Sequence, residues 1–546
     1  MTDPKHFYDR ADAWIERLME LNPGGATQLG DHRFDGELGE FSLESQDAQN
    51  EEVKAVVAEL AEMETEAWPT AAQVDHSLLT QIFKSFTRGY ESEQGHIRNP
   101  GQYLNATTGG VMLLLMKDFA PLPERLKSAL SRTKQVPRVL EEARSVIDPA
   151  QVPAVWAETA IEQGQMAPML FTMLLPSLAQ QAAPDLVDEI TEAGATAGKA
   201  VEEFVAFVRD EVLPNAAGDF AVGRERFDEI LREDHMVDYD ADELLKIGWE
   251  QLESTKKQME AVAKEIDPSK TVEEILEEAK NDHPTAETLL QTYRDAMASA
   301  KQYVLDHEIV TIPEGETLKI IETPVYMRPL IPYAAYMPPG IFEEQQDGIF
   351  VVTPVDPNAP AEVQEQKLKG QFNTKLPVTA LHEAYPGHHL QLVWANRTET
   401  VPRRMGSFLA TLFIEGWAFY CEELMEQLGW IAEPIQRLGR LAGQLWRAAR
   451  IVLDVSLHTK GMTVEEGISF MVEKVQLEPS NATAEVRRYT QTPGQPQSYL
   501  MGKLQILDLI DDLKKANPDL SMKEMHDKLL AEGSLPPRLM RQALGL

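Results

Sequence analysis

Long stretches with helical spacing of apolar residues, many of them ended by proline, dominate this chain of 546 residues. Between residues 186 and 212, apolar side chains recur at spacings of three and four, which is the pattern of an amphipathic helix. Proline cannot continue a helix, and breaks are expected at Pro149, Pro184, Pro214 and Pro268. We therefore predict a mainly α-helical protein, whose first half has helices at about 47–66, 75–92, 122–146, 151–164, 185–212 and 241–266.

The pattern changes between about 308 and 355, where short β-branched runs are bounded by proline and glycine. Runs of this kind are typical of strands. They predict a small β-sheet with strands at 309–312, 318–321 and 348–353. An edge strand at 348–353 would be able to pair with an extended substrate. Further helices are expected at about 376–396, 404–428, 433–458, 463–476, 480–490, 498–515 and 521–532.

The charge of the chain excludes several classes of function. Fifty-one basic and 88 acidic residues give a net charge of −37, which repels phosphate backbones and anionic lipids. We therefore expect no nucleic-acid partner and no membrane partner. No run of 18 apolar residues predicts a membrane span, and the first residues show no apolar signal core. With a single cysteine, these features predict a cytoplasmic protein; the oligomeric state is not predicted.

One short segment concentrates the chemistry of the chain. His382, Glu383, His388 and His389 lie within eight residues, like a zinc-binding His-Glu-x-x-His sequence opened by two residues. In a straight helix His388 would lie about 240° around from His382, and His389 would lie about 10.5 Å along the axis. The intervening Pro-Gly pair breaks the helix, and a two-residue loop would return His388 to the position of a second ligand. We favour His388, with His389 as the alternate second ligand.

A third zinc ligand is expected downstream. Glu415 stands within an intensely apolar helical segment, and a buried carboxylate is disfavoured unless it is paired or metal-bound. Glu422 and Glu423 are interpreted as solvent-facing residues of the same helix. With His382, His388 and Glu415 as ligands of one zinc ion, Glu383 would be the general base that deprotonates a zinc-bound water.

Two further clusters are candidates for the same site. One face of a predicted helix carries Arg447, Arg450, Asp454 and His458. This face is either buried and held by salt bridges, or it is a face from which Arg450 or His458 reaches the substrate. Tyr489 and Tyr499 flank a Pro-Gly turn, where either packing or hydrogen-bond donation to an oxyanion is possible.

These residues resemble a known family, the bacterial domain of unknown function numbered 885. That family is placed among the zincin-type peptidases, with thimet oligopeptidase and carboxypeptidase Taq. The resemblance covers nearly the whole chain and is carried by these motifs: His382-Glu-Ala-Tyr-Pro-Gly-His-His389 with Gln391, Glu415-Gly-Trp-Ala-Phe-Tyr420, Arg450 through Asp454 to His458, Arg488-Tyr489, Pro493-Gly-Gln495 with Tyr499, and more weakly Tyr333–Thr353 and Thr27–Asp35.

The resemblance implies a zincin-like fold with two helical halves around a deep channel. We expect a helical scaffold at 1–240 and a catalytic half at 241–546 that contains the small sheet, together forming one continuous unit. Zinc would be bound by His382, one of the following histidines and Glu415, with Glu383 as the base. The residues predicted to act in catalysis are Glu383, Tyr489, Tyr499 and His458. Those predicted to contact the substrate are Arg450, Arg488, Tyr336 and Gly348.

The leading hypothesis is a zinc-dependent hydrolase that cleaves short peptides as a carboxypeptidase, dipeptidase or oligopeptidase. A hydrolase of a non-peptide amide would have the same site. A third possibility is a non-catalytic helical binding protein in which the metal is structural or absent. The expected site has only three protein ligands, whereas structural zinc sites usually have four. This difference disfavours the non-catalytic binding protein.

Overall fold

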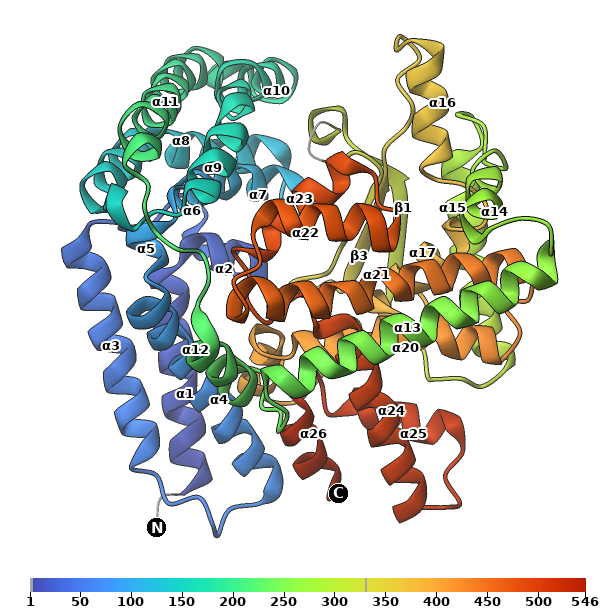
Figure 1. Ribbon diagram of the computed structural model, residues 1–546. Coiled ribbons are helices and arrows are strands. Elements are labelled where there is room, and N and C mark those ends of the chain that lie inside the picture. The colour runs from blue at the N-terminus through green and yellow to red at the C-terminus, as the bar shows by residue number, and fades with distance from the viewer. Residues whose placement is uncertain (1–2, 329–330) are drawn as a thin grey trace. The chain divides into compact units, whose positions relative to one another are not determined.

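The computed structural model of the protein describes residues 3–328 and 331–546, and it is mainly helical with one three-stranded sheet (Figure 1). The chain divides into two compact units, which are interleaved in sequence. Unit 1 comprises Met1–Trp68, Leu79–Phe220 and Gly340–Glu343, and unit 2 comprises Pro69–Leu78, Ala221–Pro339 and Glu344–Leu546.

Unit 1 is built from helices around a buried apolar core, in which α8 and α11 pack against each other. Proline residues occupy the first turn of several of these helices, where the missing N–H costs nothing. The helices of this unit are α1 (Pro4–Leu21), α2 (Pro23–Leu29), α3 (Leu43–Ala61), most of α4 (Thr70–Arg88), α5 (Gly95–Arg98), α6 (Pro100–Leu104), α7 (Gly110–Met116), α8 (Leu122–Val146), α9 (Ala154–Met166), α10 (Leu175–Ala182) and α11 (Val187–Phe207).

Unit 2 contains the sheet and the segment that is rich in histidine. Its long helices α13 and α21 pack along each other, and α20 packs against α24. Its helices are α12 (Gly223–Glu229), α13 (Ala241–Ile266), α14 (Val272–Ala279), α15 (Leu289–Asp306), α16 (Ala361–Lys369), α17 (Leu376–Glu383), α18 (His388–Ala395), α19 (Val401–Arg404), α20 (Thr411–Gln427), α21 (Pro434–Thr459), α22 (Val464–Phe470), α23 (Pro479–Tyr489), α24 (Ser498–Ala516), α25 (Met522–Ala531) and α26 (Pro537–Leu544).

The sheet has the strand order β1–β3–β2, where β1 is Thr317–Glu322, β2 is Ala334–Met337 and β3 is Asp347–Val352. β3 pairs with β1 in parallel and with β2 in antiparallel orientation. β3 is therefore the central strand, and both of its edges are already hydrogen-bonded. The prediction that 348–353 forms a substrate-binding edge strand is wrong for this reason.

The predicted strand at 309–312 is also wrong. Ile309 and Val310 are buried, but the neighbouring backbone bonds to helices and not to a sheet. The Thr311 N–H donates to the Asp527 carboxylate at 2.7 Å, and the Thr311 carbonyl accepts from the Trp394 indole at 2.9 Å. Apolar character alone does not distinguish a buried loop from a strand.

Two glycines bring α20 and α24 into backbone contact. A Cβ atom on Gly416 would lie 2.3 Å from the carbonyl carbon of Gly502, and one on Gly502 would lie 1.9 Å from the carbonyl oxygen of Leu412. Only residues without a side chain permit this approach. The contact fixes the position of α20, on which Glu415 lies.

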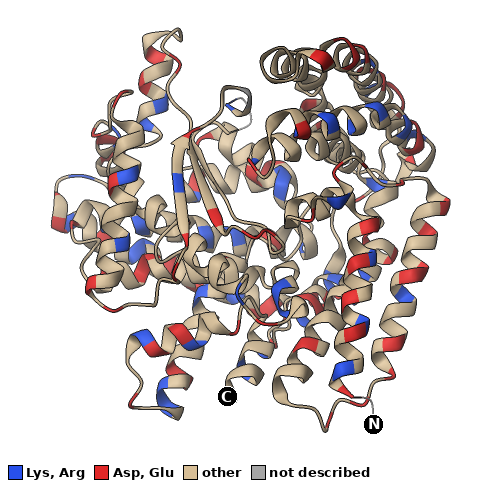
Figure 2. Ribbon diagram, turned by 180° about the vertical axis from the view of Figure 1, so that it is seen from behind, with Lys and Arg blue, Asp and Glu red and all other residues tan. Residues whose placement is uncertain are grey.

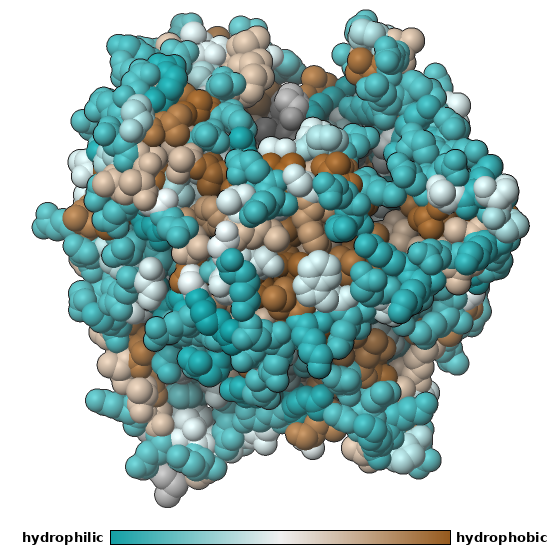
Figure 3. Space-filling model, viewed as in Figure 1, coloured by the Kyte–Doolittle hydropathy of each residue, from teal (hydrophilic) through white to brown (hydrophobic). Residues whose placement is uncertain are grey.

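The surface carries the charge that the composition predicts. Acidic positions are spread over the helices of both units (Figure 2), and hydrophilic residues cover much of the face seen in Figure 3. Among the described residues, no helix has the length and apolar character needed to cross a lipid bilayer.

A buried ion pair within unit 2 gives a test of the fold. Arg403 Nε lies 2.6 Å from Asp75 Oδ1, and both side chains are almost fully buried. We expect Arg403→Met to lower the free energy of unfolding by about 3–5 kcal/mol, because it removes the buried cation that faces the Asp75 carboxylate. Denaturant unfolding measures this loss.

The control is Arg538→Met, which breaks an exposed ion pair with Asp238 in the same unit. Exposed ion pairs contribute little, so this variant should unfold like the wild type. Equal effects of the two substitutions would contradict the expected role of burial.

Candidate metal centre

A sharp turn separates the two histidine-bearing helices. α17 ends at Glu383 and α18 begins at His388, and the Tyr385–Pro386 peptide bond in the turn is cis. The Gly387 N–H donates to the Leu381 carbonyl at 3.1 Å. A Cβ atom on Gly387 would lie 1.9 Å from the carbonyl oxygen of His382, so this close approach requires glycine.

α20 holds this turn in place. The Trp417 indole N–H donates to the carbonyl oxygen of Pro386 at 2.8 Å, and the Cys421 thiol lies 3.7 Å from the same oxygen. Glu415 is two residues before Trp417 on the same helix. The helix that binds the turn therefore also carries the acid that faces it.

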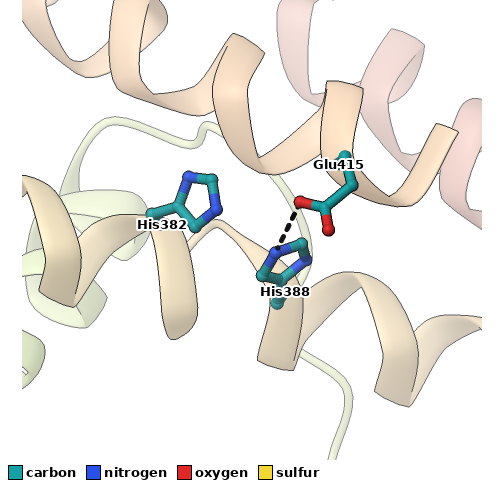
Figure 4. A group of neighbouring side chains, drawn as sticks. All are labelled: His382, His388 and Glu415. Atoms are coloured by element: carbon teal, nitrogen blue, oxygen red, sulfur yellow. Dashed lines mark ion pairs between the residues drawn. The ribbon is translucent and has the colours of Figure 1, made fainter. Parts of the chain in front are cut away.

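The structure brings His382, His388 and Glu415 together (Figure 4). One ligand atom from each of the three side chains lies within 4.8 Å of the others. His388 Nε2 is 3.4 Å from Glu415 Oε2, and the two imidazole rings are perpendicular with centroids 4.7 Å apart. The break between α17 and α18 thus places His388 beside His382, as the loop-out argument predicted.

A second carboxylate fixes the orientation of His382. Its Nδ1 is 2.8 Å from Glu422 Oε1, so Nε2 is the ring nitrogen that remains available to a metal ion. Glu422 is 1% exposed, so the prediction that it faces solvent is wrong. Arg447 Nη2 lies 3.6 Å from the same Glu422 oxygen. Burial raises the pKa of Glu422, but the charges of Arg447 and His382 outweigh burial and hold it below its usual range.

Glu415 is held as a carboxylate in spite of its surroundings. Burial raises its pKa, but hydrogen bonding to His388, the charges of His388 and His382, and a hydrogen bond from Tyr499 together lower it to about 2. Among the described residues, Glu415 Oε2 has only the 3.4 Å contact with His388 Nε2, and His388 Nδ1 has no hydrogen-bond partner. A cation among these side chains would satisfy the buried carboxylate, and two imidazoles with one carboxylate are a donor set suited to zinc.

His389 points into a different network. It is fully buried; its Nδ1 is 3.0 Å from the Tyr336 hydroxyl and its Nε2 is 2.7 Å from Glu316 Oε2. Glu316 also accepts from the Tyr385 hydroxyl at 2.7 Å and pairs with Lys301. Both ring nitrogens of His389 are therefore occupied, and the structure does not bring it into the cluster.

Tyr336 and Gly348, which we predicted to contact substrate, lie against His389. A Cβ atom on Gly348 would be 2.5 Å from His389 Nδ1. This packing accounts for glycine at that strand position, and neither residue lines the cavity described next.

A cavity of about 680 Å³ opens beside the cluster within unit 2. Its wall includes all three clustered side chains. It also includes Glu383, which is partly exposed, and Tyr499. Arg450 lines the cavity as well, with its guanidinium carbon 4.6 Å from the ring centres of both Trp446 and Tyr499.

Three other predicted residues do not line the cavity: Tyr489, His458 and Arg488. The Tyr489 hydroxyl accepts from Arg450 Nε at 2.9 Å and donates to Glu485. His458 is buried with Nε2 3.0 Å from the Tyr489 carbonyl oxygen. Arg488 bonds to Glu485 and Gln495. The contact with Tyr489 holds the Arg450 side chain in place. Together these contacts favour the interpretation that this face of α21 is buried.

Sequence reasoning missed the parts played by Glu422, Trp417 and Arg447. Glu422 follows Glu415 by seven residues, a spacing that returns to the same helix face, so this signal was present. Trp417 and Arg447 gave no such signal, because their contacts join helices that are distant in sequence.

Comparisons with known proteins show the family of the chain and solved structures with a similar fold. A family model described as "Bacterial protein of unknown function (DUF885)" matches residues 23–544, and the chain belongs to this family. The fold is similar to a "putative lipoprotein of unknown function" from Shewanella oneidensis, with a TM-score of 0.82, 24% identity and 100% coverage of both chains. It is also similar to a "putative lipoprotein" from Colwellia psychrerythraea, with a TM-score of 0.80, 18% identity, and 97% and 96% coverage of this chain and that one. No curated protein matches the chain.

The prediction of a cytoplasmic location is wrong in light of these structures. Both similar proteins are described by the words "putative lipoprotein", a description that does not fit a cytoplasmic protein. A single cysteine is compatible with several locations, so it was a weak basis for that prediction.

The turn between α17 and α18 gives a test of the site. We expect Gly387→Ala to abolish stoichiometric zinc binding while the helical circular dichroism signal remains, because the added methyl group collides with the His382 carbonyl and separates the histidines. Metal analysis after dialysis against zinc measures the loss.

Gly109→Ala is the matched control, since a Cβ atom at this helical glycine meets nothing within 4 Å. It should bind zinc like the wild type. Full zinc binding by Gly387→Ala would contradict the assigned role of the turn.

Proposed function

We propose that this protein is a zinc-dependent metallohydrolase, and specifically a peptidase that acts on short peptides. One observation carries the proposal: His382, His388 and Glu415 converge within 4.8 Å on the wall of a cavity. Two histidines and one carboxylate are a common ligand set of catalytic zinc, whereas structural zinc sites usually have four protein ligands. The cavity volume is also within the usual range for sites that bind small ligands.

The proposal includes membership of the zincin clan, with thimet oligopeptidase and carboxypeptidase Taq as relatives. The order of the site residues supports it: a His-Glu pair ends one helix, the second histidine begins the next, and the acid comes from a third. The cavity within unit 2 would be part of the substrate channel.

The residues of the chain would divide the chemistry between them. Bound zinc polarises a carbonyl group and lowers the pKa of water. Glu383, beside His382 in the cavity wall, would accept a proton from the attacking water and pass it to the leaving amine, while the hydroxyl group joins the acyl carbon. The Tyr499 hydroxyl would donate a hydrogen bond to the developing oxyanion.

Metal content and hydrolysis test the proposal directly. We expect one zinc per chain, cleavage of members of a short-peptide library, and loss of cleavage with a chelator. Glu383→Gln should retain zinc but lose about 10²–10⁴-fold in kcat, because proton transfer is removed while the ligands stay. Glu362→Gln, an exposed change on α16, is the control and should retain activity.

Different failures have different meanings. Stoichiometric zinc without cleavage of any peptide overturns the peptidase and leaves hydrolysis of other amides or a structural metal. A protein that takes up no zinc overturns the metal site itself.

The contact between Glu422 and His382 gives a second test. We expect Glu422→Gln to weaken zinc binding by about 10–100-fold, because a carboxylate behind a ligand histidine fixes its ring and raises its basicity. Competition with a fluorescent chelator measures this affinity. Glu423→Gln is the matched control, since the neighbouring Glu423 pairs with Lys503 and not with a histidine. Equal zinc affinities of Glu422→Gln and Glu423→Gln would count against His382 as a zinc ligand.

A further inference from the structure

Most of the acids in the cavity wall beside the metal centre are already bonded to residues other than Lys375. Two of the wall acids already pair with the clustered histidines, Glu415 with His388 and Glu422 with His382. Two other wall acids have partners of their own: Glu277 pairs with Lys280, and Glu273 accepts from Gln476. Glu383 is the remaining acid of the wall.

Lys375 is the cation left over. Among the residues that the structure describes, it has no ion-pair partner, and its side chain lines the cavity. Lys375 is an exposed residue of the cavity wall, and Arg447 and Lys280 line the same cavity. Like charges that face one cavity repel each other, and an anion placed between them would relieve this repulsion.

Arg447 is also incompletely satisfied. Its Nη1 donates to the Gly443 carbonyl at 3.3 Å, its Nη2 lies 3.6 Å from Glu422, and its buried Nε has no hydrogen-bond partner among the described residues. The guanidinium carbon lies 4.9 Å from the Phe419 ring centre and 5.4 Å from that of Tyr499. Aromatic rings therefore hold the guanidinium while some of its donors remain available to a carboxylate.

Lys375 lies a short distance from the cluster. Lys375 is the residue just before α17, and it is followed at spacings of four and three by Thr379 and His382 on that helix. All three residues line the cavity. Seven residues of helix span about 10.5 Å, which is the length of about three extended peptide residues. If Lys375 binds the C-terminal carboxylate of a peptide, the peptide bond at the metal centre would therefore lie a few residues before that C-terminus.

We propose that Lys375 and Arg447 bind the free C-terminal carboxylate of a peptide, so that the protein removes one to about three residues from the carboxyl end. This inference rests on the proposed zinc peptidase and narrows its substrates to peptides with an unmodified C-terminus. Arg450 is less suited to this contact, because Tyr489 and Glu485 already engage its guanidinium.

A pair of peptides that differ only at the C-terminus tests the inference. The probes are one short peptide with a free carboxylate, taken from the cleaved members of the library where there are any, and the same peptide as its amide. For the wild type, we expect a KM at least tenfold higher for the amide, with a similar kcat. Lys375→Met should raise KM about tenfold for the acid and less than twofold for the amide, because only the acid loses an ionic contact.

The matched control is Lys369→Met, which removes a lysine from α16 that does not line the cavity. It should discriminate between acid and amide like the wild type. A binding measurement complements the kinetics: titration calorimetry of both peptides into Glu383→Gln should show at least tenfold tighter binding of the acid, and the additional Lys375→Met change should abolish that preference.

The possible results separate the two proposals. Cleavage of acid and amide with equal KM overturns the carboxylate site and leaves the peptidase intact. An equal effect of Lys375→Met on both peptides also overturns the carboxylate site. Preferred binding of the acid without cleavage of either peptide supports the carboxylate site and overturns the peptidase.

Discussion

The arrangement of the candidate site depends on one hydrogen bond, which the Trp417 indole donates to the Pro386 carbonyl. The turn between α17 and α18 has a backbone path that is not helical, so its carbonyl groups need partners outside the turn. α20 supplies the donor and, two residues earlier, the acid Glu415. One contact thus sets both the separation of the two histidines and their distance from the carboxylate.

Each of the three neighbouring histidines has its own carboxylate. His382 pairs with Glu422, His388 with Glu415, and His389 with Glu316. Buried charges are costly unless paired, so these acids and histidines stabilise one another within an apolar surrounding. Only the first two pairs face the cavity, and the pair of His389 and Glu316 supports the sheet side of the turn.

The sequence was most informative where one local rule was sufficient. Helical periodicity and proline breaks predicted α8, α13, α21 and α24 within a few residues, because these patterns act over a single element. The spacing around Pro386 and Gly387 also predicted that His388 returns beside His382. Errors arose where distant segments decide the outcome, as at 309–312, whose backbone bonds to α25 and α18, and at Glu422, whose partner lies on α17.

The contact between Gly416 and Gly502 also constrains how this family can change. A side chain at either position would meet main-chain atoms, which cannot adopt another rotamer to make room. Substitution of either glycine would push α20 away from α24 and carry Glu415 with it. Natural variation should therefore be almost absent at both positions, even though neither residue takes part in chemistry. The two glycines should then identify members of the fold that have lost the histidines of the site.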